Sequence, residues 1–337
     1  MKVQKILLDA LGGSYGCIVE GSGDHKHYYN EKKITLNETL ELVSTEKVLD
    51  KGVSEFPFSF KIPLDVKSTF KTSNNFIMYQ LRAKVDIPWG KDAESENTSF
   101  HVNNVVDLND DTDTLAKGEE QYVKTYSCCC MSQGTVSANL VVNKTGFVSG
   151  EVIKVDIKVE NSSTELIKHV HIQLIQLTAV EAQGHHKTVE KKIGEIKALG
   201  AKSAAEEIPP GENREMQANI TIPKLPPSQE DQDLIMVSYK LRILPVPDSM
   251  FFVEEGAEVK ITIGNIPHKI AMAQFEAGTS EMPANVKAKY PSLPNYTETR
   301  DKYVSFTDGR ISEPESRSFC KEEGEDEEGE DEEEDEE

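Results

Sequence analysis

Alternating hydrophobic and polar residues mark two strands between residues 56 and 89, the most regular part of the chain. Every second residue of 56–62 (FPFSFKI) is apolar, and Pro63 follows at once. After an interval of turn residues, the segment 79–87 (YQLRAKVDI) again alternates apolar with polar side chains. A side-chain period of two is typical of a strand with one buried face. The pattern therefore predicts two half-buried strands separated by a polar loop.

The same arrangement occurs again about 160 residues later. Apolar residues at 220 and 222 precede Pro223, a Pro-rich interval (KLPPSQEDQ) follows, and alternation resumes at Tyr239. Tyr79 follows Pro63 by 16 positions, and Tyr239 follows Pro223 by the same number. This period is far too long for a solenoid repeat, so the sequence predicts two tandem copies of one domain.

Strand-like segments fill most of the chain, and no segment keeps an apolar period of 3.6 residues. The further predicted strands are 3–10 and 15–20, joined at Gly12-Gly13, then 39–48, 100–105, 122–130, 135–142, 151–160, 167–180, 186–196 and 257–263. Short strands separated by Gly, Pro, Asn and Ser are typical of sandwiches. We predict an all-β protein of two tandem, immunoglobulin-like antiparallel β-sandwiches.

The predicted strands divide the chain into three parts. Residues 1–121 form the first sandwich and a linker, 122–268 the second sandwich, and 269–337 a disordered tail. If the domains are copies, residues 3–9 correspond to 167–173, yet the second copy has two strands before that point. We therefore expect the first sandwich to be truncated by roughly 30 residues. A fragment, a short isoform and a mis-assigned start codon remain open as explanations.

The negative charge is concentrated at the end of the chain. Residues 321–337 carry 13 of the 22 net negative charges, and no stripe of basic and aromatic residues predicts nucleic-acid binding. No apolar run reaches the roughly 18 residues that span a bilayer, and the apolar start of the chain is interrupted by Asp9. Five cysteines, an odd number, favour a reducing compartment over a disulfide framework. We predict a cytoplasmic protein.

Several motifs in order resemble the alpha-arrestin family of arrestin-domain-containing proteins. They are FPFSFKIP, YQLRAKVDIPW, FHVNNVVDLN, TGFVSGEVIKVDIKVENSS, IPPGENREMQANITIPKLPPS, MVSYKLRI and ITIGNIP, within about residues 1–268. The resemblance implies two arrestin sandwiches and a non-enzymatic adaptor that needs no cofactor. It further implies binding to membrane-protein cargo tails, to HECT-class ubiquitin ligases with WW domains and to endocytic sorting machinery, with peripheral residence at the plasma membrane and endosomes.

One tail segment is a candidate for ligase binding. The family motif is Pro-Pro-x-Tyr, whereas this chain offers the variant Leu293-Pro294-Asn295-Tyr296. A WW domain stacks proline of an extended segment on aromatic rings and holds a tyrosine a fixed distance away. A flexible Pro-containing linker explains the same residues without any partner.

Three adjacent cysteines, Cys128, Cys129 and Cys130, lie where the first predicted strand of the second half ends. Successive side chains of a strand alternate faces, so they fit poorly with a zinc site, and buried small residues are the default interpretation. Lipid attachment is the remaining candidate role.

The histidines do not change this picture. His169 and His171 share one face of a predicted strand, and His185-His186 follow in the next turn. Outward polar residues on a half-exposed sheet explain this spacing without a metal, and we predict none.

No nucleophile with its base, phosphate-binding Gly loop or metalloprotease motif is found, so we predict no enzyme activity. The alternative to an adaptor is a retromer-subunit-like, arrestin-fold sorting component, which would purify in a coat complex of fixed stoichiometry.

Overall fold

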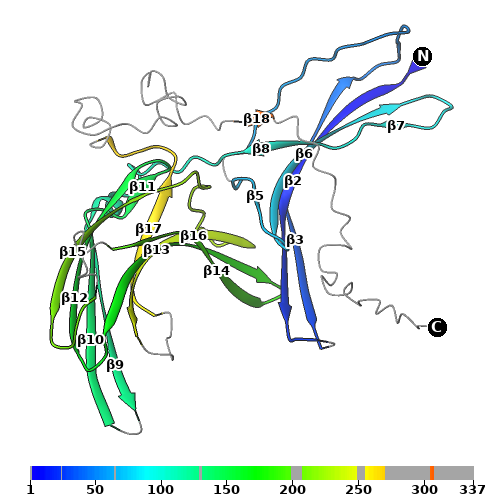
Figure 1. Cartoon of the computed structure of the whole chain (residues 1–337). Helices are drawn as coiled ribbons and strands as arrows, with labels where there is room; N and C mark the ends of the chain where they lie inside the picture. The colour runs from blue at the N-terminus through cyan, green and yellow to red at the C-terminus, as the bar shows by residue number, and fades with distance from the viewer. Residues whose placement is uncertain are drawn as a thin grey trace, which may run out of the picture.

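The computed structural model describes residues 2–23, 25–63, 66–128, 131–198, 207–248, 255–269 and 304–306. Nearly all regular structure in them is strand, and their one helical element is a short 3-10 helix, η1 (Thr112–Leu115). Figure 1 shows the first half, in blue and cyan, beside the second half, in green and yellow. The predicted all-β fold of tandem sandwiches is confirmed.

The second half is a sandwich of two sheets. One sheet has the order β15-β12-β10-β9, and the other has the order β11-β17-β16-β13-β14. The strands are β9 (Gly118–Cys128), β10 (Met131–Val142), β11 (Gly146–Val148), β12 (Val152–Ser163), β13 (Ile167–Ala182), β14 (His185–Lys197), β15 (Asn213–Thr221), β16 (Ile235–Pro247) and β17 (Ala257–Gly264). Their alternating apolar residues, such as Leu140, Ile153 and Ile261, are fully buried in one core. Every strand predicted for this half is present.

The first half has one large sheet, of order β18-β8-β6-β2-β3, in which β5 and β7 also pair with β6, while β1 pairs with β4. Its strands are β1 (Lys2–Val3), β2 (Lys5–Glu20), β3 (His27–Val43), β4 (Lys47–Val48), β5 (Phe70–Lys71), β6 (Phe76–Asp86), β7 (Ala93–Glu94), β8 (Thr98–Val102) and β18 (Val304–Phe306). The short β18 falls inside the tail predicted to be largely disordered, and it pairs with β8. The rest of the tail lies outside the described residues.

The predicted strand at 56–62 is the main correction. These residues lie in no strand. The equivalent segment of the second half, β15, is held by backbone hydrogen bonds to β12, and the described part of the first half contains no strand in the place of β12. Phe60 still packs on the core, with its ring centroid 6.1 Å from that of Phe100. The alternation therefore matches partial burial at Phe56, Phe60 and Ile62, whereas Phe58 is 42% exposed and no ladder forms.

The sequence predicted a turn at Gly12-Gly13, but this glycine pair lies inside β2. The strand runs without interruption from Lys5 to Glu20, and its register with β3 shifts at these two glycines. A Cβ atom on Gly12 would lie 2.1 Å from the Tyr79 ring, and one on Gly13 would lie 2.2 Å from the Lys33 carbonyl oxygen. The extra residue of this bulge is Thr35 of β3, and the glycine pair opposite it lets the neighbouring strands approach closely.

The repeat seen in the sequence has a structural counterpart. Tyr79 and Tyr239 are both fully buried. The Tyr79 hydroxyl donates to the Lys67 carbonyl oxygen (2.7 Å), and the Tyr239 hydroxyl donates to the Pro226 carbonyl oxygen (2.8 Å). In each half a buried tyrosine on a central strand thus fastens the preceding proline-containing loop, as expected of two copies of one domain.

The expectation of reduced cysteines does not hold throughout. Cys17, a buried residue of β2, is disulfide-bonded. The sequence alone gave no signal for this bond.

Candidate functional site

The two halves meet where the turn between β13 and β14 lies against β2 and β3, and we call this contact the joint. Ile18 and Tyr29 of the first half pack on Val180 and Ala182 of the second. The Tyr29 ring also stacks on the His185 ring, with centroids 3.6 Å apart. Figure 1 shows the ends of β13 and β14 that meet at this turn beside β2 and β3. His185, considered above as a metal ligand, is therefore part of the joint.

The backbone of the turn is fastened as well as its side chains. The Gln183 amide N–H donates to Glu31 Oε2 (2.7 Å), and its side-chain nitrogen donates to the Asn30 carbonyl oxygen (2.9 Å). Gln183 has a positive φ of 53°, which bulky residues rarely adopt. The neighbouring Lys187 ammonium donates to the Val19 carbonyl oxygen (2.8 Å). These directional bonds fix the angle at which the turn meets the first half.

A second group of contacts connects the loop after Pro63 with the Pro-rich loop of the second half. The buried Ser68 amide N–H donates to Gln229 Oε1 (2.7 Å). Lys67 pairs with Asp231 at 2.8 Å, and Lys33 of β3 pairs with Asp233 at the same distance. One partner in each pair is exposed to solvent, so each ion pair contributes little, and the buried amide bond is the stronger restraint.

The linker between the halves is fastened to the end of the second sandwich. The Val106 amide donates to Asn265 Oδ1 (2.7 Å), and the Asn109 side chain donates to the Pro267 carbonyl oxygen (3.0 Å). The buried His268 ring lies 3.1 Å from Thr114 Oγ1 of η1. Desolvation and the nearby Lys144 ammonium hold the pKa of His268 below its usual value. The linker is therefore fastened to the end of the second sandwich at several points.

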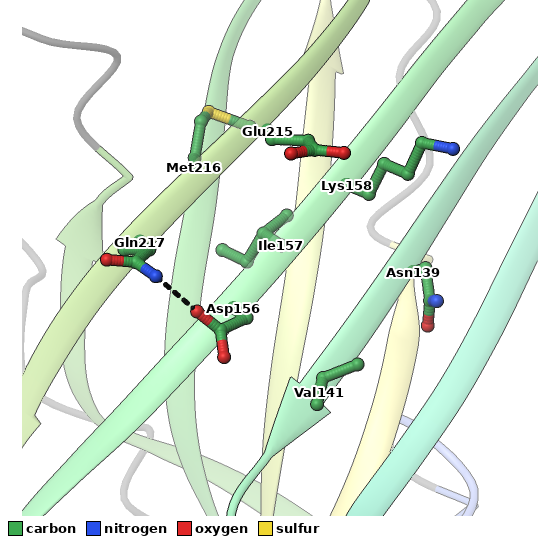
Figure 2. A pocket seen from close by; sticks show the side chains of 8 residues that line it. All are labelled: Asn139, Val141, Asp156, Ile157, Lys158, Glu215, Met216 and Gln217. Carbon is green, nitrogen blue, oxygen red and sulfur yellow. Dashed lines mark hydrogen bonds between the residues drawn. The ribbon is translucent and has the colours of Figure 1, made fainter.

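The outer face of the β15-β12-β10-β9 sheet carries a shallow depression of about 480 Å³. Figure 2 shows its side chains standing on β10, β12 and β15. Gln217 donates to Asp156 Oδ1 (2.8 Å), while Lys158 and Glu215 occupy opposed positions on β12 and β15. This mixed, open surface has neither a nucleophile nor an enclosed volume, and its chemistry is that of a polar contact face.

A charged cluster lies across β14, β16 and β17. Arg242 contacts Glu190 (2.8 Å) and Glu258 (2.5 Å), and Lys240 contacts the same two carboxylates at 2.5 and 2.9 Å. The two cations are 11% and 12% exposed, and they keep the pKa of Glu190 below its usual value against the opposing effect of burial. The cations and carboxylates balance, so the cluster stabilises the sheet face.

The other histidines have separate partners. The His169 and His171 rings stack at 5.3 Å, and His171 Nδ1 lies 2.8 Å from Glu195 Oε1. The pKa of Glu195 is lowered to about 2, mainly by hydrogen bonds from Gln173 and Lys192. His186 lies 3.8 Å from Glu181. Within the described residues, no group of three or more His, Cys, Asp or Glu side chains could hold a metal ion.

The predicted ligase motif and two of the three adjacent cysteines lie outside the described residues. Leu293, Pro294 and Tyr296 lie outside the described residues, as do Cys129 and Cys130, while Cys128 ends β9. The described residues contain no helix with the length and hydrophobicity needed to span a bilayer.

Comparison with known proteins now supplies the family. The family model for the N-terminal domain of arrestin (or S-antigen) matches residues 19–109, and that for its C-terminal domain matches residues 132–268. Together they cover about two thirds of the chain, and each falls within one half of the structure. The chain belongs to the arrestin-domain-containing, or alpha-arrestin, family. The resemblance inferred from sequence motifs is confirmed.

Relatives of this alpha-arrestin occur in distant animals. It is 29% identical to arrestin domain-containing protein 17 of Caenorhabditis elegans over 66% of this chain and 50% of the relative. It is 24% identical to mouse arrestin domain-containing protein 1, over 73% of this chain and 54% of the relative. For human arrestin domain-containing protein 4 the identity is also 24%, over 74% and 59%. The chain thus spans about half the length of the curated relatives that it matches.

Proposed function

We propose that this alpha-arrestin is a non-enzymatic adaptor in membrane-protein trafficking. It would bind cargo tails through its sandwiches and recruit endocytic and ubiquitin-ligase machinery through its tail. Membership of the family is the observation that carries this proposal. The joint supports it, since an adaptor acts by position and needs its binding surfaces in a fixed relation. Such a protein raises the effective concentration of one partner near another without chemistry of its own.

Ligase recruitment is assigned to Leu293, Pro294 and Tyr296. One such motif binds weakly, so a WW domain should release it readily unless cargo provides a second contact. As part of this proposal, the protein acts in the cytoplasm, at the cytosolic face of the plasma membrane and endosomes.

Pull-down with isolated WW domains of a HECT-class ligase tests the assignment. The substitution Tyr296→Ala should abolish capture of the full chain. Tyr290→Ala is the matched control, because Tyr290 precedes rather than follows its neighbouring proline and should leave capture unchanged. Equal capture of both variants and the parent protein would remove LPNY from the proposal. Co-purification in a complex of fixed stoichiometry that is insensitive to Tyr296 would favour the coat-component alternative.

A further inference from the structure

The single tryptophan of the chain stands on the turn that joins β6 to β7. Trp89 is fully exposed, at 106% of its reference area, and its φ is 62°. The turn is closed by the Gly90 amide donating to the Ile87 carbonyl oxygen (3.1 Å) and the Ile87 amide donating to Asp92 Oδ1 (3.3 Å). A defined turn therefore holds the indole in solvent.

This conformation is costly for the fold. A positive φ on a bulky residue costs about 1–3 kcal/mol, and an exposed indole gains nothing from burial in the protein. Backbone strain of this kind is typical of positions that contact something else.

Two more exposed apolar residues lie at the same end of the first half. Lys5 is opposite Asp86 on β6, and Lys2 is opposite Val48 on β4. The chain after Asp86 therefore continues beside β1, which lies between it and β4. Val48 is 66% exposed and Val53 is 94% exposed. Figure 1 shows the N-terminus, the β6–β7 turn and the chain after β4 together at the end farthest from the second half.

The charges at this end are interleaved and nearly balanced. Lys47, Lys51 and Lys91 are exposed, and each has an acidic residue next to it or one position away. Lysines beside an apolar tip can extend along it and keep their ammonium groups in water. A balanced set of charges gives no strong preference for anionic surfaces.

We propose that Val48, Val53 and Trp89 form an apolar tip that inserts into the interfacial layer of a lipid bilayer. Val48 and Val53 are exposed on the segment that follows β3, and Trp89 is exposed on the β6–β7 turn. Tryptophan is characteristic of the membrane–water interface. Because the charges around the tip balance, the membrane surface that it contacts is of the zwitterionic, phosphatidylcholine type. The contact is shallow and weak alone, and it acts together with cargo binding. It does not involve the tail, so it is independent of the WW motif.

The chain reports on this contact directly, because its tryptophan emission comes from Trp89 alone. Phosphatidylcholine vesicles should shift the emission of the full chain to shorter wavelength, and brominated acyl chains should quench it. Unchanged emission with saturating vesicles would overturn the proposal. A shift that appears only with a purified protein partner, and never with vesicles, would also overturn it and identify the tip as a protein contact.

Vesicle flotation supplies the test by mutation. Trp89→Asn introduces a residue that tolerates positive φ. It should weaken vesicle binding by about tenfold or more, because one large apolar side chain no longer transfers from water to the bilayer. Val123→Thr, which changes an exposed valine on β9 of the other half, is the control and should bind as the parent does. Equal flotation of all three proteins would contradict insertion of the tip. Capture by WW domains should be the same for all three, so failure here is distinguishable from failure of the adaptor proposal.

Discussion

Removing the hydroxyl of Tyr239 tests whether the buried tyrosine holds the second sandwich together. The hydroxyl donates to the Pro226 carbonyl oxygen (2.8 Å) and accepts from Gln176 Nε2 (2.9 Å), and Gln176 is itself buried. Desolvation raises the pKa of Tyr239 well above its usual value, which reflects the dry surroundings. Tyr239→Phe leaves a carbonyl and an amide without this partner, and each buried unsatisfied group costs about 1–3 kcal/mol. We expect a loss of about 2–4 kcal/mol in the free energy of unfolding.

Urea unfolding followed by far-UV circular dichroism measures this loss. With a slope of about 2 kcal/mol per molar urea, the midpoint should fall by about 1–2 M. Tyr122→Phe is the control, because the Tyr122 hydroxyl bonds to Glu255 at an exposed position and its loss should change the midpoint little. If Tyr239→Phe unfolds at the same urea concentration as Tyr122→Phe, the tyrosine does not fasten the loop and the reasoning is refuted.

Two further outcomes follow from buried groups. The pKa of His268 in the folded protein is lowered from 6.5. Its contribution to stability is therefore complete above pH 6.5 and is lost as the pH falls toward the pKa of the folded state. The melting temperatures at pH 7.5 and 5.5 should differ less for His268→Gln than for the parent. Gly12→Ala places a methyl group 2.1 Å from the Tyr79 ring and should cost about 1–3 kcal/mol in urea unfolding. Gly194→Ala, where a methyl group meets open space, is its control, and equal costs would contradict the close approach.

Periodicity predicted the second half well because each of its strands has neighbours on which to pair. It failed at 56–62 because alternation says nothing about a hydrogen-bonding partner, and without one the segment is only partly buried, with Phe58 exposed. The error at Gly12-Gly13 has another origin. A glycine pair marks a turn or a close approach of strands equally well, and the Tyr79 ring that decides between them lies more than sixty residues away in the sequence.

The joint could not be predicted from the sequence at all. Its apolar residues, Ile18 and Val180, look like ordinary core residues of their own strands, and only the docking of the two halves brings them together. His185 was noticed for its spacing to other histidines, yet its role is to stack on Tyr29. Contacts between domains leave little periodic signal, because each side contributes only a few residues from a strand end or a turn.

The small size of the joint explains why so many of its contacts are directional. The contact at the turn comprises four apolar side chains in all, and a contact of that size alone between separate molecules would be too small to hold them together. The linker removes most of the cost of association, because its own bonds to Asn265 and Pro267 keep the second half close to the first. With the two halves held close by the linker, the apolar contact needs only to favour their association. The hydrogen bonds of Gln183 and Gln229 then select one angle between the two halves. These directional bonds fix the relation of the two sandwiches at a few defined points.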